Sequence, residues 1–343
     1  MSSKEEKKKS ISSLGKYGLI KHITGEKIPQ NKSTLSAIGD DAAIIDSSGN
    51  LILTTTDLIL EGIHFNLVYT PLKHLGYKAV IRAISDIYAM NARPGQVMIS
   101  VGLSNRFSLE QIEELYEGIH LACTRYNVDL AGGDTCSSLT GLTLGVTAIG
   151  TVEPGKVVLR GGAAVNDLIC ITGDIGASYM GLQLLERERK LFEGEGDIQP
   201  DLSGCEYIIG RQLKPELPVD VLDELEDKGI IPTSMIDISE GLSSDLLQIC
   251  QSSNTGCRIY ADKIPVDPET ARMAGEFSMD PLVPALNGGE DYELLFTVAL
   301  KDYEIISGIK KLSIIGHITE KDKGCSIVAN DGKEIELKSR GWG

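Results

Sequence analysis

The order of apolar and polar positions predicts alternating strands and helices along the whole chain. Residues 36–46 and 51–57 are typical of two β-segments joined by a Ser-Ser-Gly-Asn turn, which indicates a hairpin. From about Lys73 to Met90 apolar residues recur at helical spacing, so Asp86 is expected near the end of an amphipathic helix. The other elements expected in the first half are strands over 96–104, 128–134 and 141–152, and a helix that Ser108 caps and that ends near Arg125.

A change of pattern at residues 153–167, where turn residues gather, predicts a domain boundary. We therefore expect a polar tail over 1–13 and two domains, 14–153 and 154–343, of an α/β (α+β) class with much antiparallel pairing. In the second domain we expect strands over 167–176, 234–238, 291–298, 311–318 and 325–329, and helices over 176–189, within 205–228 on either side of Lys-Pro-Glu-Leu-Pro, and after Leu242.

The charge balance excludes some partners. The chain has 343 residues and a formal net charge of −16, so its overall field repels nucleic acid and anionic membranes. No apolar run is long enough to span a bilayer. An anionic small substrate is compatible with this charge if divalent cations invert the local field.

The chain has seven cysteines and no Cys-x-x-Cys pair, which predicts reduced thiols. Its start is polar and shows no signal-peptide pattern, so we expect a cytoplasmic location.

Residues 150–156, Gly-Thr-Val-Glu-Pro-Gly-Lys, match part of a phosphate-binding loop. Val157 stands where that motif needs Ser or Thr, and residues 157–160 are expected to continue as a strand instead of opening a helix. The motif is therefore rejected.

Acidic residues recur in short patches that are far apart in sequence. If the fold brings them together, their hard oxygen ligands suit Mg²⁺ that holds nucleotide phosphates. Taken singly, each patch is explained as well by a turn, a strand end or a helix cap, and Ser239 with Glu240 is also typical of a helix N-terminus. The candidate ligands are Asp41, Thr55, Thr56, Asp57, Asp86, Asp134, Asp237 and Glu240.

Together these motifs resemble the thiamine-monophosphate kinase family, in the superfamily of aminoimidazole ribonucleotide synthetase and selenophosphate synthetase. The resemblance runs from about Leu14 to Trp342 and rests on the order of seven motifs. These are Ile-Gly-Asp-Asp-Ala-Ala, Thr-Thr-Asp before Glu-Gly-Ile-His-Phe, the helix from Gly-Tyr-Lys-Ala to Ile-Ser-Asp-Ile, Ala-Gly-Gly-Asp, Met-Ile-Asp-Ile-Ser, Asn-Gly-Gly-Glu-Asp-Tyr-Glu-Leu-Leu-Phe and the terminal Arg-Gly-Trp. It implies a two-domain aminoimidazole ribonucleotide synthetase-like fold whose N-terminal domain pairs across a homodimer. It also implies transfer of the ATP γ-phosphoryl group to thiamine monophosphate with several Mg²⁺ ions.

Carried over by position, the resemblance implies metal ligation by Asp41, Thr56, Asp57, Asp86, Asp134 and Asp237. It implies nucleotide contacts by Tyr116, Gly133, Arg160 and Ser239, and contacts to the thiamine compound by His64, Glu290 and Trp342. Arg160 and Asp237 are the catalytic candidates. The family commonly has Asp-Ile-Ser-Asp-Gly-Leu, whereas Glu240 here extends the last carboxylate by one methylene.

The chemistry of the acceptor limits what the protein must supply. The second pKa of a phosphate monoester is about 6, so its attacking oxygen needs no general base. The reaction needs alignment and neutralisation of two anions, for which Arg160 is a candidate cation. Each of these candidate residues also has a structural explanation that needs no function. Arg160 could form a surface salt bridge, and His64 could serve in the fold. Trp342 could belong to a tail folded back on the core, and Glu290 could stand in a turn. Another ATP-dependent enzyme of the superfamily, or a non-catalytic scaffold that binds a nucleotide or a metal, remains as an alternative.

Overall fold

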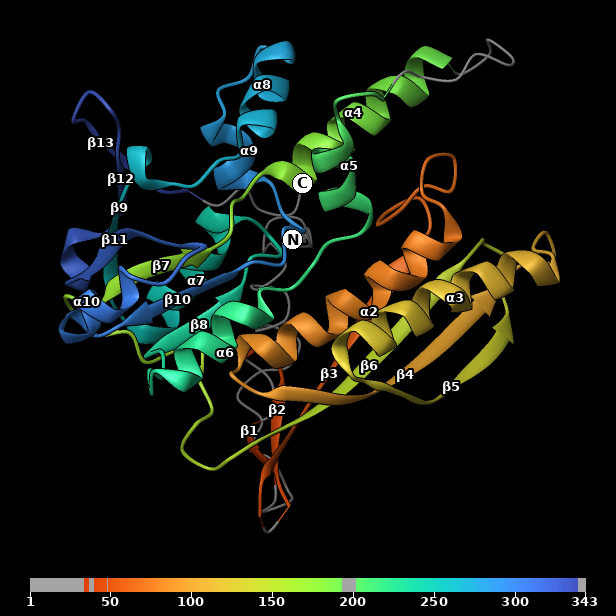
Figure 1. The fold of residues 1–343 in the computed structure, drawn as a ribbon, viewed down its shortest axis with the longest axis horizontal. Helices are drawn as coiled ribbons and strands as arrows, with labels where there is room; N and C mark the ends of the chain where they lie inside the picture. The colour runs from red at the N-terminus through yellow and green to blue at the C-terminus, as the bar shows by residue number, and fades with distance from the viewer. Residues whose placement is uncertain (1–33, 37–39, 48, 193–201, 339–343) are drawn as a thin grey trace, which may run out of the picture.

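The computed structural model describes residues 34–36, 40–47, 49–192 and 202–338, and arranges them in two β-sheets with helices packed against them (Figure 1). Its first part contains β1 (Thr34–Ser36), β2 (Ala43–Asp46), β3 (Leu51–Leu60), α2 (Leu72–Ala89), β4 (Arg93–Leu103), α3 (Leu109–Tyr126), β5 (Asp129–Ser137) and β6 (Thr143–Val152). The strand order of this sheet is β1-β2-β3-β6-β4-β5. Its described pairs are antiparallel except β4 with β5, which are parallel.

The second part contains a seven-stranded sheet in the order β13-β12-β9-β11-β7-β10-β8. Within it β9 and β12 run parallel, and the other described neighbours are antiparallel. Its strands are β7 (Leu168–Thr172), β8 (Ser234–Asp237), β9 (Gly256–Tyr260), β10 (Leu294–Val298), β11 (Leu312–Thr319), β12 (Cys325–Val328) and β13 (Glu334–Glu336). Its α-helices are α4 (Ala177–Phe192), α5 (Glu206–Leu213), α6 (Val219–Asp227), α7 (Leu242–Ser253), α8 (Pro268–Glu276), α9 (Leu282–Asn287) and α10 (Tyr303–Ile306).

Helices α2 and α3 cover one face of the first sheet (Figure 1). The apolar positions of α2 recur at helical spacing and are buried, which fixes the side that it turns to the sheet. Ser108 begins α3 with a capping box, in which its hydroxyl accepts from Gln111 N and the Gln111 side chain accepts from Ser108 N. A Cβ on Gly76 or Gly118 would collide with the backbone of the opposite helix, so these glycines permit the close approach of α2 and α3.

Helix α2 also joins the two parts of the molecule. Its residues contact β3, β4 and β6 of the first sheet and β8 of the second. One continuous apolar core therefore includes Leu53 of β3, Val80 of α2, Met235 of β8 and Phe296 of β10, all of which are almost completely buried. The two sheets are fixed to each other through this helix, and polar residues on α2 can face both.

The structure confirms the hairpin of β2 and β3, the helix that carries Asp86 and the helix that Ser108 caps. It corrects the strand expected over 157–160, because these residues belong to no regular element and no helix opens there either. The segment expected as one strand over 36–46 is wrong in part, because Ser36 ends the separate strand β1 and β2 covers only Ala43–Asp46. The strands β1, β9 and β13 and the helices α8, α9 and α10 were not predicted. Among the helices of the described ranges, none combines the length and apolar character required to cross a bilayer.

Candidate active site

Three carboxylates that are distant in sequence meet beside α2, the helix that contacts both sheets. Asp41 lies just before β2, Asp86 is near the end of α2, and Asp237 ends β8. One oxygen of each side chain lies within 4.8 Å of one oxygen of each of the others. The side chains come from both sheets and from the helix between them, so the complete fold is needed to form the group.

Neighbouring hydroxyls hold two of these acids in place. Thr55 Oγ1 donates to Asp86 Oδ2 at 2.6 Å, and Ser85 Oγ donates to Asp237 Oδ2 at 2.8 Å. Ser239 Oγ donates to the other oxygen, Asp237 Oδ1, at 3.3 Å. These bonds orient the carboxylates but add no positive charge.

Arg160 supplies a cation at one side of the acid group. Its Nε donates to Asp41 Oδ2 at 3.0 Å and its Nη2 to Asp41 Oδ1 at 2.5 Å, which is the two-pronged geometry that guanidinium groups favour. The Arg160 backbone N–H donates to Asp40 Oδ2 at 3.0 Å. Arg160 is therefore part of the site and not a solvent-exposed ion pair, because its side chain and that of Asp41 are both largely shielded from solvent.

The negative charges of the acid group are not fully balanced by nearby positive side chains. Burial raises the pKa of Asp86 well above its usual value, and the charges of Asp57, Asp237 and Asp41 raise it further. Burial and then Asp41 raise the pKa of Asp237 to about 7. Carboxylates packed in this way are stabilised by a bound cation, whose charge opposes both effects.

Asp57 adds the clearest sign of a missing partner. Its Oδ1 accepts from Arg82 Nε at 3.0 Å, whereas its Oδ2 is buried and has no hydrogen-bond partner. A buried carboxylate oxygen without a partner is costly unless a ligand occupies the adjacent space. Hard oxygen donors of this kind fit Mg²⁺.

The remaining metal candidates lie outside the three-carboxylate group. Thr56 points to the opposite face of β3, where its Oγ1 lies 3.1 Å from Thr147 Oγ1. Asp134 is exposed on the edge strand β5, and β6 and β4 separate that strand from β3. Glu240 lies in the loop before α7, close to the group in sequence, and its backbone N–H donates to Asp245 Oδ2 at 3.2 Å.

The nucleotide candidates are also divided. Ser239 and Arg160 contact the acid group. Gly133 neighbours Asp134 on β5, and its φ of +155° together with a clash of any Cβ against Ile99 O explains the glycine. Tyr116 lies on α3, with its ring centroid 6.4 Å from that of His120, and has no described contact with the acids.

A pocket next to the acid group contains two of the three predicted substrate residues. His64 and Glu290 both line it, together with Tyr69, Lys78, Arg82 and Tyr292. Trp342 falls outside the described residues. The pocket lies between the end of β3, α2, α5 and the segment before β10, so it too is formed by both parts of the fold.

Charged residues of α2 that the sequence analysis did not single out organise this pocket. Lys78 Nζ donates to Glu290 Oε2 at 2.8 Å, and Arg82 Nη1 donates to Glu290 Oε1 at 3.3 Å. Burial acts to raise the pKa of Glu290, but Lys78 and Arg82 outweigh it and lower the pKa. The signal was available, because Lys78, Arg82 and Asp86 are spaced four residues apart on an otherwise apolar helix.

The protonation of His64 follows from its surroundings. Its Nδ1 accepts a hydrogen bond from Leu60 N at 3.1 Å, so a neutral ring carries its proton on Nε2. Burial lowers the pKa of His64, and Arg82 lowers it further. His64 is therefore a neutral hydrogen-bond donor at the pocket near pH 7.

Two family models match most of the chain. The AIR synthase related protein N-terminal domain matches residues 39–152, and the AIR synthase related protein C-terminal domain matches residues 164–328.

The chain is similar over nearly its whole length to curated thiamine-monophosphate kinases. It is 32% identical to that of Bacillus subtilis over 339 residues, covering 96% of this chain and 99% of the relative. It is 34% identical to that of Buchnera aphidicola subsp. Schizaphis graminum over 317 residues, covering 90% and 93%.

Solved structures give the same result. One described as AaThiL complexed with AMPPCP and TMP has a TM-score of 0.79 at 29% identity, covering 97% of this chain and 98% of that one. The thiamine monophosphate kinase of Aquifex aeolicus has a TM-score of 0.76 at 28% identity, covering 96% and 100%.

Proposed function

This chain belongs to the thiamine-monophosphate kinase family and phosphorylates thiamine monophosphate with ATP, and we propose that Asp41, Asp57, Asp86 and Asp237 hold the Mg²⁺ that this reaction uses. The observation that carries the proposal is the meeting of three carboxylates within 4.8 Å, beside a buried Asp57 oxygen that has no partner. Bound Mg²⁺ neutralises phosphate charge and orients the polyphosphate.

Arg160 and Ser239 are the proposed nucleotide contacts. Arg160 presents a guanidinium group at the edge of the acids, where it can offset negative charge that develops on the transferred phosphoryl group. Ser239 lies between Asp237 and the start of α7. Its hydroxyl and the first N–H groups of that helix are therefore placed to donate hydrogen bonds to a nucleotide phosphate. The acceptor oxygen is already ionised near neutral pH, and the chain needs to supply no general base.

His64 and Glu290 are the proposed contacts to thiamine monophosphate. His64 offers its Nε2 proton to a phosphate oxygen or another acceptor of the substrate. Glu290 stays ionised because Lys78 and Arg82 hold it, and its negative charge complements the cationic thiazolium ring. The pocket adjoins the acid group through Arg82, which contacts both Asp57 and Glu290, so acceptor and donor phosphates are brought to neighbouring positions.

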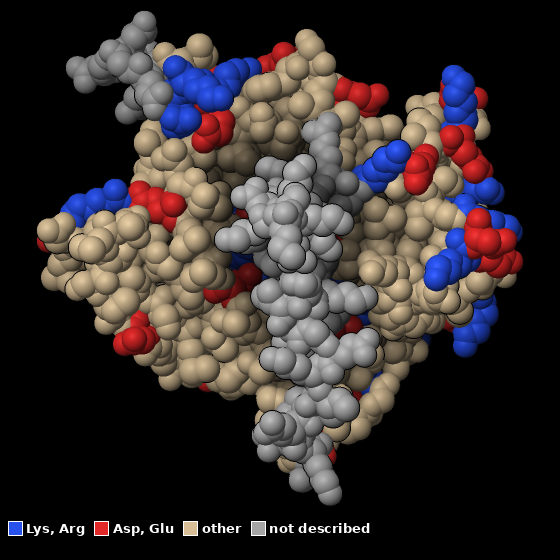
Figure 2. All heavy atoms as spheres, turned by 180° about the vertical axis from the view of Figure 1, so that it is seen from behind, with Lys and Arg blue, Asp and Glu red and all other residues tan. Residues whose placement is uncertain are grey.

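We also propose that residues 14–153 form a domain that pairs in a homodimer through the sheet face opposite α2 and α3. Apolar side chains on that face include Leu58, which is 57% exposed, and Met98, which is 37% exposed. In Figure 2, charged side chains lie mainly near the rim of the visible face. Light scattering after gel filtration tests this, since Leu58→Glu with Met98→Glu should convert a dimer to a monomer.

Activity with purified protein tests the function. With Mg²⁺, ATP and thiamine monophosphate, the products should be thiamine diphosphate and ADP, and EDTA should abolish turnover. Free thiamine should not replace the monophosphate, because its hydroxyl lacks an ionised phosphate oxygen. Nucleotide binding without turnover would support the non-catalytic alternative.

We propose a cytoplasmic location on the ground that all seven cysteines are free thiols.

A further inference from the structure

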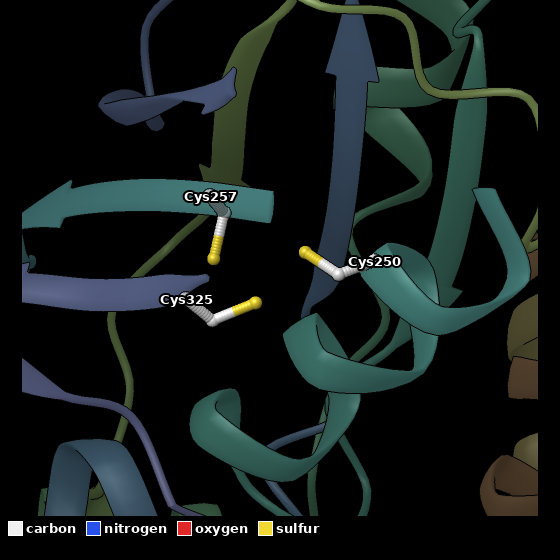
Figure 3. A group of neighbouring side chains, drawn as sticks. All are labelled: Cys250, Cys257 and Cys325. Carbon is white, nitrogen blue, oxygen red and sulfur yellow. The ribbon is translucent and has the colours of Figure 1, made fainter. Parts of the chain in front are cut away.

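Three cysteine sulfurs meet in the second sheet toward the edge that lies away from β8 and Asp237. Cys250 is in the last turns of α7, Cys257 is on β9, and Cys325 begins β12. Their Sγ atoms all lie within 4.8 Å of one another. Figure 3 shows the three side chains pointing toward a common space between the two strands and the helix.

Regular structure fixes the positions of these thiols. Cys257 and Cys325 are directly paired on the parallel strands β9 and β12, so their side chains leave the same face of the sheet. The backbone of each is hydrogen-bonded, with Cys257 N donating to Gly324 O at 3.1 Å and Leu337 N donating to Cys325 O at 2.9 Å. Helix α7 packs on that face and brings Cys250 to them, so little rearrangement is needed for the three to share a ligand.

Ordinary core packing explains the burial of the thiols but not their arrangement. Free cysteines often behave as small apolar residues, and Cys170 on β7 is a buried cysteine that belongs to no group of three metal-ligand side chains among the described residues. Cys250 and Cys257 are buried, whereas Cys325 is partly exposed and gives the group an opening to solvent. A reactive ligand can therefore reach the three sulfurs without unfolding the domain.

We propose that Cys250, Cys257 and Cys325 form a binding site for a thiophilic metal ion, Zn²⁺ or Cu⁺. Metal–sulfur bonds of about 2.3 Å place two sulfurs on one ion roughly 3.7–4 Å apart, which small side-chain rotations reach from the present positions. No other His, Cys, Asp or Glu of the described residues joins the group, so three thiolates are the protein ligands. Cu⁺ accepts such a set, and Zn²⁺ adds a water at the side of Cys325.

Binding of the metal ion to the three thiols releases protons. Each thiol gives its proton to solvent as its sulfur bonds the ion, so up to three protons leave and affinity falls as the pH is lowered. The ion would tie β12 and α7 to β9, far from the acid group. The site goes beyond the proposed kinase chemistry and does not depend on it.

The test is direct titration of the full-length protein, reduced and freed of metal. Co²⁺, the spectroscopic probe for Zn²⁺, should give a sulfur-to-metal charge-transfer band at one equivalent, and Zn²⁺ should displace it. Cu⁺ is titrated in a second arm against a chromophoric chelator, and the tighter binder identifies the ion. Cys325→Ser should weaken binding by about tenfold or more while retaining the fold, because its side chain is partly exposed.

Cys136→Ser is the matched control, since Cys136 is an exposed thiol outside the cluster, and it should leave the titration unchanged. A thiol count in denaturant confirms that all seven cysteines are reduced, and circular dichroism confirms that each variant is folded. With reduced, folded protein, the absence of a Co²⁺ charge-transfer band together with no withdrawal of Cu⁺ from the chelator would overturn the proposal. Equal binding by wild type and Cys325→Ser would overturn it as well.

Discussion

Ser85 Oγ donates a 2.8 Å hydrogen bond to Asp237 Oδ2 and so connects helix α2 of the first sheet to strand β8 of the second at the acid group. Both residues are almost fully buried. Together with the bond from Ser239 Oγ to Asp237 Oδ1, it fixes the orientation of the Asp237 carboxylate. It makes the orientation of a proposed metal ligand depend on the packing of the two sheets.

Ser85→Ala should therefore damage activity and stability together. Loss of a buried hydrogen bond to a carboxylate costs about 1–3 kcal/mol of unfolding free energy, and the freed Asp237 should raise the Mg²⁺ concentration needed for half-maximal turnover. Urea denaturation and Mg²⁺ titration of kcat measure the two effects. Ser307→Ala, at an exposed position after α10, is the control and should change neither.

Asp86→Asn should separate stability from activity. Burial and three nearby acids raise the pKa of Asp86, so removal of its charge should make the protein without Mg²⁺ more resistant to urea. The same change should reduce kcat by about 100-fold or more, because a metal ligand is lost. Asp129→Asn, at an exposed site on β5, should leave both unchanged. Full activity in Asp86→Asn would remove this residue from the proposed metal site.

Arg160→Lys should be far less active than wild type although it keeps the charge. Lysine cannot reproduce the paired bonds that Arg160 makes to Asp41, and it presents a point charge to phosphate instead of a planar fork. We expect a fall in kcat of about 100-fold, with thermal stability lowered only modestly. Steady-state kinetics with saturating ATP and thiamine monophosphate check this. A variant with normal kcat would show that the reaction does not need the planar guanidinium group of Arg160.

Glu290→Gln should act on the acceptor and not on ATP. The amide lacks the negative charge that complements thiazolium, and it leaves Lys78 and Arg82 without their shared partner. We expect KM for thiamine monophosphate to rise about tenfold or more while KM for ATP stays near its wild-type value. A parallel rise of both constants would indicate general disruption of the site.

The pH dependence of stability should carry a contribution from Asp291. Burial raises the pKa of Asp291 from its usual 3.8 to about 7, against the opposing effects of Arg211 and the N–H groups of Gly176 and Ser178. Between these values the folded state holds a proton that the unfolded state has lost. This contribution is therefore complete below pH 4 and disappears as the pH rises to 7, with a limiting slope of about 1.4 kcal/mol per pH unit.

Asp291→Asn removes that titration, whatever constant effect the amide has on the hydrogen bonds. Unfolding free energies in urea at pH 5, 6, 7 and 8 should fall less steeply with pH for the variant than for wild type. Identical slopes would show that Asp291 is ionised throughout this range in the folded protein.

Local sequence pattern predicted the elements that carry the site. The hairpin before Asp57 and the helix around Asp86 both have long, regular apolar spacing, and the structure confirms them. Strand β9 was missed because its five residues follow a helix directly and lack a clear alternation. Helix α9 was missed because it is one turn and a half long and contains Pro284.

The convergence of side chains was harder to predict than the elements. Asp134 and Asp86 looked equivalent in sequence, yet the order of strands puts Asp134 on the outer strand of the sheet and Asp86 among the acids. The meeting of Cys257 with Cys325 depends on a parallel pairing across 68 residues, for which the spacing of cysteines gives no sign. Strand order is set by global packing and does not follow from local pattern.

The dual attachment of α2 has a consequence for how the enzyme can be divided. Any fragment that keeps only one sheet loses part of the proposed Mg²⁺ site, because Asp41 and Asp57 belong to the first sheet's part of the chain and Asp237 to the second's. Fragments should therefore bind Mg²⁺ weakly even when each folds, and mixing them should restore capture of the ion only to the extent that α2 docks again. Reassembly of the two halves could in this way be followed through magnesium affinity alone.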